Sequence, residues 1–513
     1  MTRQGVLVEP YERLSYEQLE QVHQASLEIL KNPGIVSYNK AAAKYFEDNG
    51  AQVTAIKQGD VPCWKIQIPQ KIISAALHTV PQVVKLGARD KNNSLLLDGA
   101  EPRVFLVSGS ETNIWLDISF QKYVKKTNPD IEISVPEFNR RRGTVADLCR
   151  AAHLCEHLDT LDAFIRPVNI QDKDITEENK DVNKYFASLD NTTKHVMAGL
   201  TKLEQLDNIV HMAEIIAGGK QQLKENPIIS FITCMVKSPL QFIDETTQTL
   251  IEISKMNLPV AISCSPQAGT TAPLTELGII VQINAEILAG ITLSQLVNKG
   301  TPVLYGSVPV RARLDTLNDS YGAPETSQYN IDSVQMARFY KIPCYSTSGV
   351  CDNKTPGIQS TSERMLSNTL VALSGPQYLH CAYGLLDSNS TFCPLQAVID
   401  DAQFQMLKFF LQTPKFTKDD FEDNISQIRE VIASPKKLYI RYIRSRIRRG
   451  QVSMPYPFEG DGTTDDVLAL ADEKMKNIFA QPVKHIDRVT TNKVFQEIPG
   501  LLPRLNTYGE GGK

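Results

Sequence analysis

The sequence predicts a (β/α)8 TIM barrel with an N-terminal α+β cap and a helical C-terminal extension. Three observations lead to this prediction. Short apolar strands alternate with helical patterns between about residues 100 and 411. The later strands start about 30–45 residues apart, which is the spacing of βα units. The sequence contains neither GxGxxG nor GxxxxGK[ST], the phosphate loops typical of the doubly wound open sheet, which is the main competing fold.

The repeating unit is clearest in residues 265–306. A polar loop that carries Gly and Thr comes first. Pro273 then opens a long apolar helix, which stops before Gly300. A short strand from Pro302 follows and ends at Gly306. A loop, a helix and a strand in one pass form one unit of a β/α barrel.

The N-terminal cap is predicted over residues 1–100. Ser15 is a candidate helix N-cap, and Gln18 three residues later completes the pattern of a capping box. Residues 64–68, with the sequence WKIQI, alternate apolar and polar side chains and predict a strand.

The barrel is predicted over residues 101–411. Short buried strands are expected at 103–108, 162–168, 194–199, 228–235, 259–264, 302–307, 343–348 and 377–383. Helices are expected at 144–158, 202–217, 241–256, 274–298, 325–340, 360–374 and 394–411. The long gap 109–143 is expected to carry extra structure. Residues 412–513 are expected to form the extension, which is helical as far as residue 480 and has a frayed tail at 509–513.

Composition excludes several classes of protein. The net charge of −4 over 513 residues gives no general affinity for nucleic acid or membranes. No signal peptide is expected, because residues 1–30 lack an uninterrupted apolar stretch. Residues 277–297 are the most apolar window, but Gln282 and Glu286 within it favour a buried helix over a membrane span. Nine scattered cysteines without a CxxC pair indicate reduced thiols and a cytoplasmic location.

Function in barrels of this type resides at the C-terminal ends of the strands. There the sequence offers hydroxyls and aromatic rings, without the paired carboxylates of a glycosidase, an HExxH motif or a His/Cys cluster. Aromatic faces suit a cationic ammonium group. The expected ligand is a small polar molecule, which can be a cation. The substrate-binding candidates are Phe105, Glu111, Trp115, Tyr305, Tyr345, Thr347 and Tyr383, and the positioning candidates are His195, Asp352 and His380.

Each candidate also has a structural interpretation. His195 lies near a strand start, where structural histidines are common. The tyrosines fit barrel packing as well as a cage around a ligand. Glu111 can be a helix cap, and Arg166 can form an ion pair instead of binding a carboxylate. The chemistry does not follow from these residues alone.

Several ordered segments resemble the trimethylamine methyltransferase superfamily. They are residues 14–30, 191–199, 265–306, 347–359 and 380–401, which include the wording TAPLTELG, TSGVCDNKTPGIQ and AYGLLDS. The resemblance spans about residues 11–411. It implies a barrel enzyme of one-carbon metabolism that passes a methyl group from a methylated amine to the cobalt of a separate corrinoid protein.

The founding members of this superfamily carry pyrrolysine, and this sequence contains none. It therefore resembles the non-pyrrolysine branch, whose members act on quaternary amines such as glycine betaine. The resemblance implies a cob(I)alamin nucleophile supplied by the partner, no tightly bound cofactor and no metal site. A quaternary nitrogen leaves as a neutral tertiary amine, so the enzyme needs only to position the reacting groups. The turn Ser108–Glu111 departs from the Gly-rich turn of relatives.

The C-terminal region also departs from relatives, because it carries a basic run in place of a His-rich segment. The run is either a solvated helix face or a docking patch for an acidic corrinoid protein. Its residues are Lys436, Lys437, Arg441, Arg444, Arg446 and Arg448. A homo-oligomer is expected, because helix 274–298 has more apolar surface than one face of a barrel needs.

Two other functions remain open from the sequence. One is a lyase or hydrolase that uses His380 and Asp352 as base and acid. The other is a non-catalytic betaine-binding protein. The identity of the quaternary amine depends on the less typical loops at 105–115 and 345–359.

Overall fold

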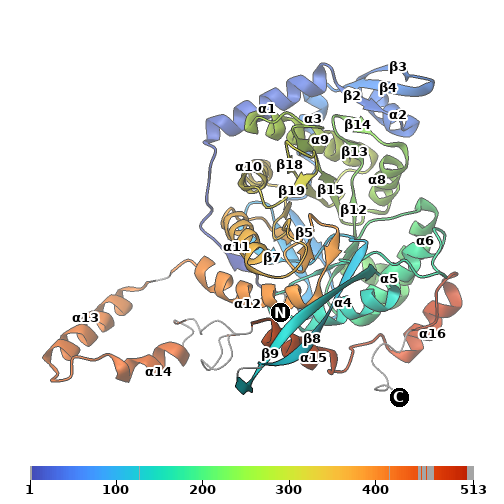
Figure 1. Ribbon diagram of the computed structural model, residues 1–513. Helices are drawn as coiled ribbons and strands as arrows, with labels where there is room; N and C mark the ends of the chain where they lie inside the picture. Colours follow the sequence, from blue (N-terminus) through green and yellow to red (C-terminus); the bar gives the residue numbers. More distant parts are fainter. Residues whose placement is uncertain are drawn as a thin grey trace.

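The computed structural model describes residues 3–125, 128–414, 416–448, 452, 458 and 467–504 (Figure 1). A nine-stranded sheet lies at its centre, in the order β1-β7-β21-β20-β17-β15-β12-β11-β10. Its neighbouring strands are parallel, except for the antiparallel pair β1–β7. The strands are β1 (Val6–Leu7), β7 (Arg103–Leu106), β10 (Phe164–Ile165), β11 (Val196–Ala198), β12 (Ile229–Thr233), β15 (Val260–Cys264), β17 (Val303–Ser307), β20 (Cys344–Thr347) and β21 (Tyr378–His380).

The eight predicted strands are confirmed, because β7 and the seven other parallel strands each lie within a predicted range. The sheet curls around an apolar core of its own. That core contains side chains of β7, β10, β11, β15, β17, β20 and β21, and a two-stranded ladder, β5 (Val83–Leu86) with β6 (Leu95–Asp98), packs against it. Between β7 and β10 there is a parallel bridge, Val107 opposite Ala163, in place of a longer ladder.

Helices cover the outer face of the sheet, as predicted. They are α4 (Val145–His157), α6 (Leu206–Ala217), α8 (Asp244–Met256), α9 (Glu276–Val297), α10 (Pro324–Phe339), α11 (Ile358–Leu373) and α12 (Pro394–Leu411). The sequence did not predict α5 (Lys180–Asn191), because the helix has many polar residues. These polar residues are nevertheless buried, and Lys184 and Asp181 form an ion pair of 2.6 Å inside the protein.

Helix α9 is buried on all sides. Every residue from Ile279 to Gln295 is buried, and helices α8 and α10 lie beside it, together with α1 (Tyr16–Lys31), α2 (Lys40–Asp48) and α3 (Gln70–Leu77). By length and composition α9 could cross a membrane, but it lies inside the protein, as a core helix does. The chain's own N-terminal helices cover the apolar surface from which the sequence predicted a homo-oligomer, so this surface is not available to a second chain.

The N-terminal cap contains the helices α1, α2 and α3 and a five-stranded sheet in the order β13-β14-β2-β4-β3 (Figure 1). Its strands are β2 (Ile35–Ser37), β3 (Gln52–Gln58), β4 (Val61–Gln67), β13 (Val236–Lys237) and β14 (Gln241–Phe242), so that the strand predicted at 64–68 is confirmed as part of β4. The predicted capping box is also confirmed. The Ser15 hydroxyl accepts a hydrogen bond from the Gln18 N–H, and the Gln18 side chain accepts one from the Ser15 N–H.

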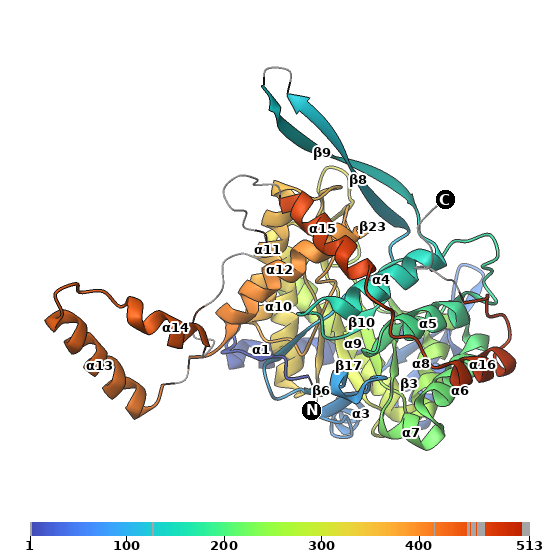
Figure 2. The ribbon, with the colours of Figure 1, turned by 90° about the horizontal axis from the view of Figure 1, so that it is seen from below.

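The gap 109–143 contains a long hairpin of β8 (Ile114–Lys125) and β9 (Asn128–Arg142), which projects from the body (Figure 2). Two short strands, β22 (Leu385–Leu386) and β23 (Thr391–Phe392), pair at its base, and β23 runs parallel to β8. A small sheet of β16 (Gln267–Ala268), β18 (Val310–Ala312) and β19 (Asp319–Ser320) follows β15 and β17.

The extension after residue 411 is helical, as predicted. Helices α15 (Val467–Phe479) and α16 (Arg488–Glu497) return to the body, where α15 packs on α12 and α4 and α16 on α6. Helices α13 (Lys418–Ala433) and α14 (Ile440–Arg448) instead stand away from it (Figure 1). The predicted tail at 509–513 lies outside the described residues. A short helix, α7 (Lys220–Glu225), follows α6.

Candidate functional site

Solvent reaches the inner face of the sheet at the C-terminal ends of the strands, which we call the mouth. Ile232 and Val308 pack on the interior core and are only partly buried. Cys234, just after β12, is exposed. We call the accessible space beside these three residues the recess. The accessible part of the interior is therefore at the mouth, where the sequence predicted the site.

Three candidates meet at the mouth. Tyr345 stacks on His380 with ring centroids 3.8 Å apart, and on its neighbour Tyr378 at 5.8 Å. The Thr347 hydroxyl lies 2.6 Å from His380 Nε2 and donates to the Ser307 carbonyl at 3.2 Å. Since that hydroxyl has a single proton, it accepts from His380 Nε2–H.

The other ring nitrogen of His380, Nδ1, lies 2.9 Å from the Cys381 thiol and accepts from it. Burial lowers the pKa of His380 to about 3. The imidazole is thus neutral and bonded at both nitrogens. Cys381 has a φ of 61°, a conformation that costs energy in a non-glycine residue. His380 is therefore fixed in place and has no free nitrogen for proton transfer.

Arg166 and Glu111 form an ion pair at the mouth, from the ends of β10 and β7. The Arg166 side chain is 6% exposed, whereas the Glu111 side chain is 32% exposed, so the cation lies deeper than the anion. Arg166 Nε has no hydrogen-bond partner among the described residues. An unpaired buried donor beside an accessible recess is suited to bind an anionic group of a ligand.

Asp352 organises the mouth loops. Its carboxylate accepts hydrogen bonds from the Ser320 hydroxyl at 2.9 Å, the Tyr321 N–H at 2.9 Å, the Gly322 N–H at 3.2 Å and the Ser388 hydroxyl at 2.8 Å. The loops after β17, β20 and β21 therefore meet at one carboxylate. The four donors hold this carboxylate in place and give it a structural role in the loops.

The remaining candidates lie away from the recess. Tyr305 and Tyr383 belong to the core between sheet and helices, where the Tyr305 hydroxyl donates to Asn284 at 3.0 Å and Tyr383 packs on Phe404 with centroids 5.0 Å apart. His195 precedes β11, at the opposite end of the sheet from the mouth, and burial lowers its pKa to about 4.

Phe105 is buried deep in the interior core. Trp115 is fully buried at the base of the β8–β9 hairpin, where the guanidinium groups of Arg141 and Arg150 lie 5.9 and 5.4 Å from the centre of its ring. The structure therefore brings together His380, Tyr345 and Thr347, but it does not bring the aromatic candidates around one cavity.

The sequence did not predict several buried charged groups that hold the mouth loops. Asp181 accepts from the backbone N–H groups of Thr201 and Lys202 at 2.7 and 2.9 Å, which fixes the loop after β11. Arg364 and Asp400 fix the loops after β20 and β21. Glu286 fixes the loop after β12. The one signal in the sequence was Glu286, a carboxyl in the middle of an apolar helix.

Glu286 is enclosed by donors. It accepts from the Ser238 hydroxyl at 2.8 Å, the Leu240 N–H at 3.0 Å and the Gln282 amide at 3.0 Å. Burial nevertheless raises its pKa from 4.5 to about 7. Between these two values the folded protein binds a proton at Glu286 that the unfolded chain does not bind. The contribution of Glu286 to stability is therefore present at low pH and is lost as the pH rises toward 7.

We expect Glu286→Gln to remove this dependence on pH. The free energy of unfolding of the variant, relative to the unchanged protein, should rise by about 2 kcal/mol between pH 5 and pH 8, because the amide never carries the buried charge. Urea unfolding of both proteins across this range measures the difference. Glu252→Gln, on the more exposed helix α8, is the control and should show little change. A constant difference across the range would contradict a raised pKa at Glu286.

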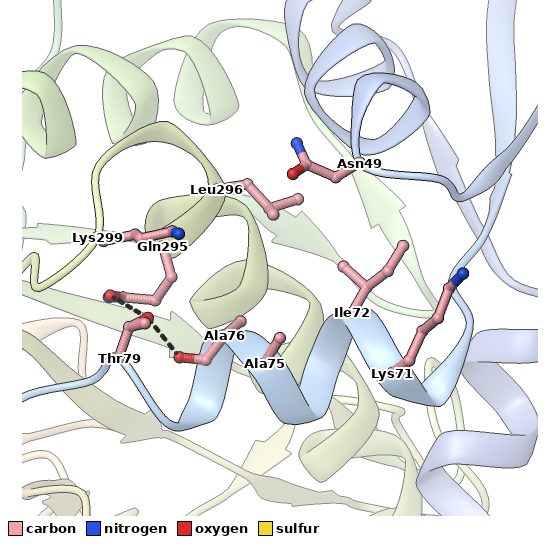
Figure 3. A pocket seen from close by; sticks show the side chains of 9 residues that line it. All are labelled: Asn49, Lys71, Ile72, Ala75, Ala76, Thr79, Gln295, Leu296 and Lys299. Atoms are coloured by element: carbon pink, nitrogen blue, oxygen red, sulfur yellow. Dashed lines mark hydrogen bonds between the residues drawn. The ribbon is translucent and has the colours of Figure 1, made fainter.

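Other hollows lie at the opposite end of the sheet. One, of about 290 Å³, is between α3 and the last turn of α9, lined by Ile72, Ala76 and Leu296 with Lys71 and Lys299 at its edge (Figure 3). A larger groove of about 940 Å³ includes residues of β5, α6 and α7. Neither contains a candidate from the strand ends, so the mouth remains the candidate site.

Comparison with known proteins identifies the family. Residues 4–122 and 132–440 match the trimethylamine methyltransferase (MTTB) family. The chain belongs to this family. Trimethylamine methyltransferase MttB from Desulfitobacterium hafniense (strain DSM 10664 / DCB-2) is 30% identical over 394 residues, which are 77% of this chain and 74% of that protein.

Two further relatives differ in the substrate that their names give. Trimethylamine methyltransferase MttB from Methanosarcina thermophila is 27% identical over 92% of this chain and 93% of its own length. Glycine betaine methyltransferase from Desulfitobacterium hafniense (strain Y51) is 24% identical over 81% of this chain and 80% of its own length. The chain is therefore an MTTB-family methyltransferase, and the predicted resemblance is confirmed.

Proposed function

We propose that this protein transfers a methyl group from a small betaine, a quaternary amine with a carboxylate tail, to Co(I) of a partner corrinoid protein. Membership of the MTTB family supports the methyl transfer. The observation that carries the choice of substrate is the pair of opposite charges at the mouth, Arg166 below and Glu111 nearer to solvent. We also propose that the curled sheet is a closed (β/α)8 barrel, joined where Val107 and Ala163 bridge.

A betaine is a zwitterion that matches this pair. Its carboxylate can bind the deeper Arg166 through charge-assisted hydrogen bonds, and its ammonium can lie near Glu111. The methyl groups then point to the open mouth. When the partner presents cob(I)alamin there, cobalt supplies the nucleophile. Orientation of the N–CH₃ bond toward the opening is the task of the residues at the mouth.

No residue needs to donate a proton, because a quaternary nitrogen leaves as a neutral tertiary amine. His380 is neutral and hydrogen-bonded at both ring nitrogens, and the Asp352 carboxylate accepts four hydrogen bonds. Residues fixed in this way suit methyl transfer better than the acid–base chemistry of a lyase or hydrolase. In our proposal His380 holds Thr347 and Tyr345 in place, and Asp352 holds the mouth loops. The cytoplasm is the proposed location, since nine free cysteines suit a reducing compartment.

The test is methyl transfer to chemically reduced cobalamin, followed by the absorbance of methylcobalamin. Glycine betaine, proline betaine, carnitine, tetramethylammonium and trimethylamine serve as donors. We expect product with at least one carboxylate-bearing quaternary amine and none with trimethylamine. Formation of methylcobalamin from trimethylamine alone would assign the protein to tertiary amines. Absence of product with every quaternary amine would sink the proposal.

A further inference from the structure

The hairpin of α13 and α14, which we call the arm, stands apart from the rest of the molecule (Figure 1, Figure 2). No helix or strand of the described barrel packs extensively on it. The arm follows α12, near whose C-terminal end Lys408 Nζ lies 2.8 Å from the Thr160 carbonyl and 3.4 Å from Asp162, just before β10 begins. The arm therefore leaves from the end of the sheet opposite to the mouth.

An apolar seam runs along each helix of the arm. The spacing is 4, 3 and 4 residues on α13 and 3 and 4 residues on α14, which is the repeat of a coiled-coil seam. The side chains of the seam are 45% to 65% exposed. They are Phe421, Ile425, Ile428 and Ile432 on α13, and Ile440, Ile443 and Ile447 on α14.

Polar contacts join the two helices, while the side chains of the seams stay exposed. Arg441 pairs with Glu430 at 2.6 Å, and the Tyr442 hydroxyl donates to the same carboxylate at 2.6 Å. Arg446 donates to the Asn424 side chain at 2.7 Å. Large apolar side chains in this number are rarely left in water on a monomer, so the seams indicate an interface.

The two helices of the arm carry opposite charge. Helix α13 has five acidic and two basic side chains, a net charge of −3, and its acidic residues gather near its start, at Asp419, Asp420, Glu422 and Asp423. Helix α14 has four arginines and no acidic residue, a net charge of +4. One surface thus offers both signs of charge together with an apolar seam.

We propose that the arm is the surface through which two copies of this chain associate. A two-fold interface requires a patch that is complementary to itself, and the arm has that property. Two hairpins of this kind form a four-helix bundle, in which α13 of one chain lies beside α14 of the other. Acidic and basic helices then face each other, and the isoleucines are buried between them.

Two other possible partners fit the arm less well than a second copy of the chain. An anionic membrane would attract α14 but repel α13. A corrinoid protein must approach the mouth, whereas the arm leaves from the opposite end of the sheet. The sequence predicted the basic run as a candidate docking patch for the corrinoid protein. In our proposal its arginines on α14 pair instead with α13 of a second chain. The proposal does not rest on the substrate or on the methyl transfer.

The first test is the mass of the full-length protein in solution, by light scattering over a range of concentrations. We expect a mass that corresponds to two chains or to a larger even number of chains. Ile428→Asp with Ile443→Asp should raise the dissociation constant at least about 100-fold, because buried carboxylates replace two isoleucines in each chain. The far-UV circular dichroism of the two proteins should match, since no helix or strand among the described residues outside the arm packs extensively on it. Val489→Asp, at an exposed position of α16, is the control and should leave the mass unchanged.

A charge exchange tests the pairing of the helices. Arg444→Glu with Arg448→Glu removes the basic character of α14, whose net charge falls from +4 to 0. Asp419→Lys with Asp423→Lys removes the acidic character of α13. Each of these variants should associate more weakly than the unchanged chain, and a mixture of the two should regain the association.

Four results would overturn the proposal. The first is a monomeric wild-type protein, and the second is an assembly that the seam variant leaves intact. The third is binding of a monomeric wild-type protein to anionic phospholipid vesicles. The fourth is a change in the salt dependence of methyl transfer to a corrinoid protein when Arg444 and Arg448 are replaced by Glu, without any change in mass. That last result would restore the arm as a partner-docking patch.

Discussion

Arg364→Met is expected to lower the free energy of unfolding by about 3–5 kcal/mol, as the loss of one partner of a fully buried ion pair does. Arg364 and Asp400 are both inaccessible to solvent. Arg364 donates to Asp400 through Nε at 2.8 Å and through a terminal nitrogen at 2.5 Å. Methionine keeps the shape of the chain but leaves the carboxylate buried without its cation.

Three backbone carbonyls add to this loss. Arg364 also donates to the carbonyls of Gly349, Leu385 and Ala382, the last two at 2.6 and 2.9 Å. Burial alone would lower the pKa of this guanidinium, but Asp400 and Cys351 together outweigh burial and the pKa is raised. One side chain therefore ties the loops after β20 and β21 together, next to Thr347 and His380. We expect methyl transfer to fall with stability in this variant.

Urea unfolding and the melting temperature measure the effect. The matched control is Arg313→Met, because Arg313 forms a similar pair with Asp315 at 2.8 Å whose side chains are 53% and 63% exposed. An exposed pair of this kind contributes about 0–1 kcal/mol. Arg364→Met with Asp400→Leu should recover part of the loss, since no charge is then left buried. A cost of Arg364→Met no larger than that of the control would refute the argument.

The strands and most helices were predictable because burial dictates their sequence. Parallel strands covered on both faces read as short apolar runs, and all eight runs became strands. Helix α5 was missed because its polar residues are buried, as the ion pair of Asp181 and Lys184 illustrates, and a polar sequence does not predict burial. The β8–β9 hairpin was missed although its sequence alternates apolar and polar residues, as Leu116, Ile118 and Phe120 illustrate. The gap 109–143 was expected only to carry extra structure.

The sequence predicted that the site lies at the C-terminal ends of the strands. It did not predict which side chains of those strands point into the site. Successive side chains of a strand point to opposite faces, and the sequence does not say which set faces inward. Tyr345 points to the interior core, whereas Tyr305 points to the helices. The buried charged groups that fix the loops could not be predicted for another reason. Asp400 and Arg364 are 36 residues apart in the chain, and only the fold makes them a pair.

The substrate proposal rests on Arg166, and its removal should separate two kinds of donor. In Arg166→Ala we expect kcat/KM for glycine betaine to fall at least 100-fold, which is about 2.7 kcal/mol, because a charge-assisted, partly bidentate contact to the carboxylate is lost. Tetramethylammonium has no carboxylate, so its kcat/KM should change by less than about three-fold. Methylcobalamin formation with both donors measures the ratio.

Arg166→Lys is the companion variant. A lysine restores the charge but not the two-pronged geometry, so betaine turnover should recover only in part. The removal of Arg166 also leaves Glu111 without its partner, which should favour the purely cationic donor. An equal loss for both donors, with an unchanged melting temperature, would mean that Arg166 shapes the mouth without contacting the substrate. A loss confined to glycine betaine would identify the carboxylate as the group that the inner end of the mouth recognises.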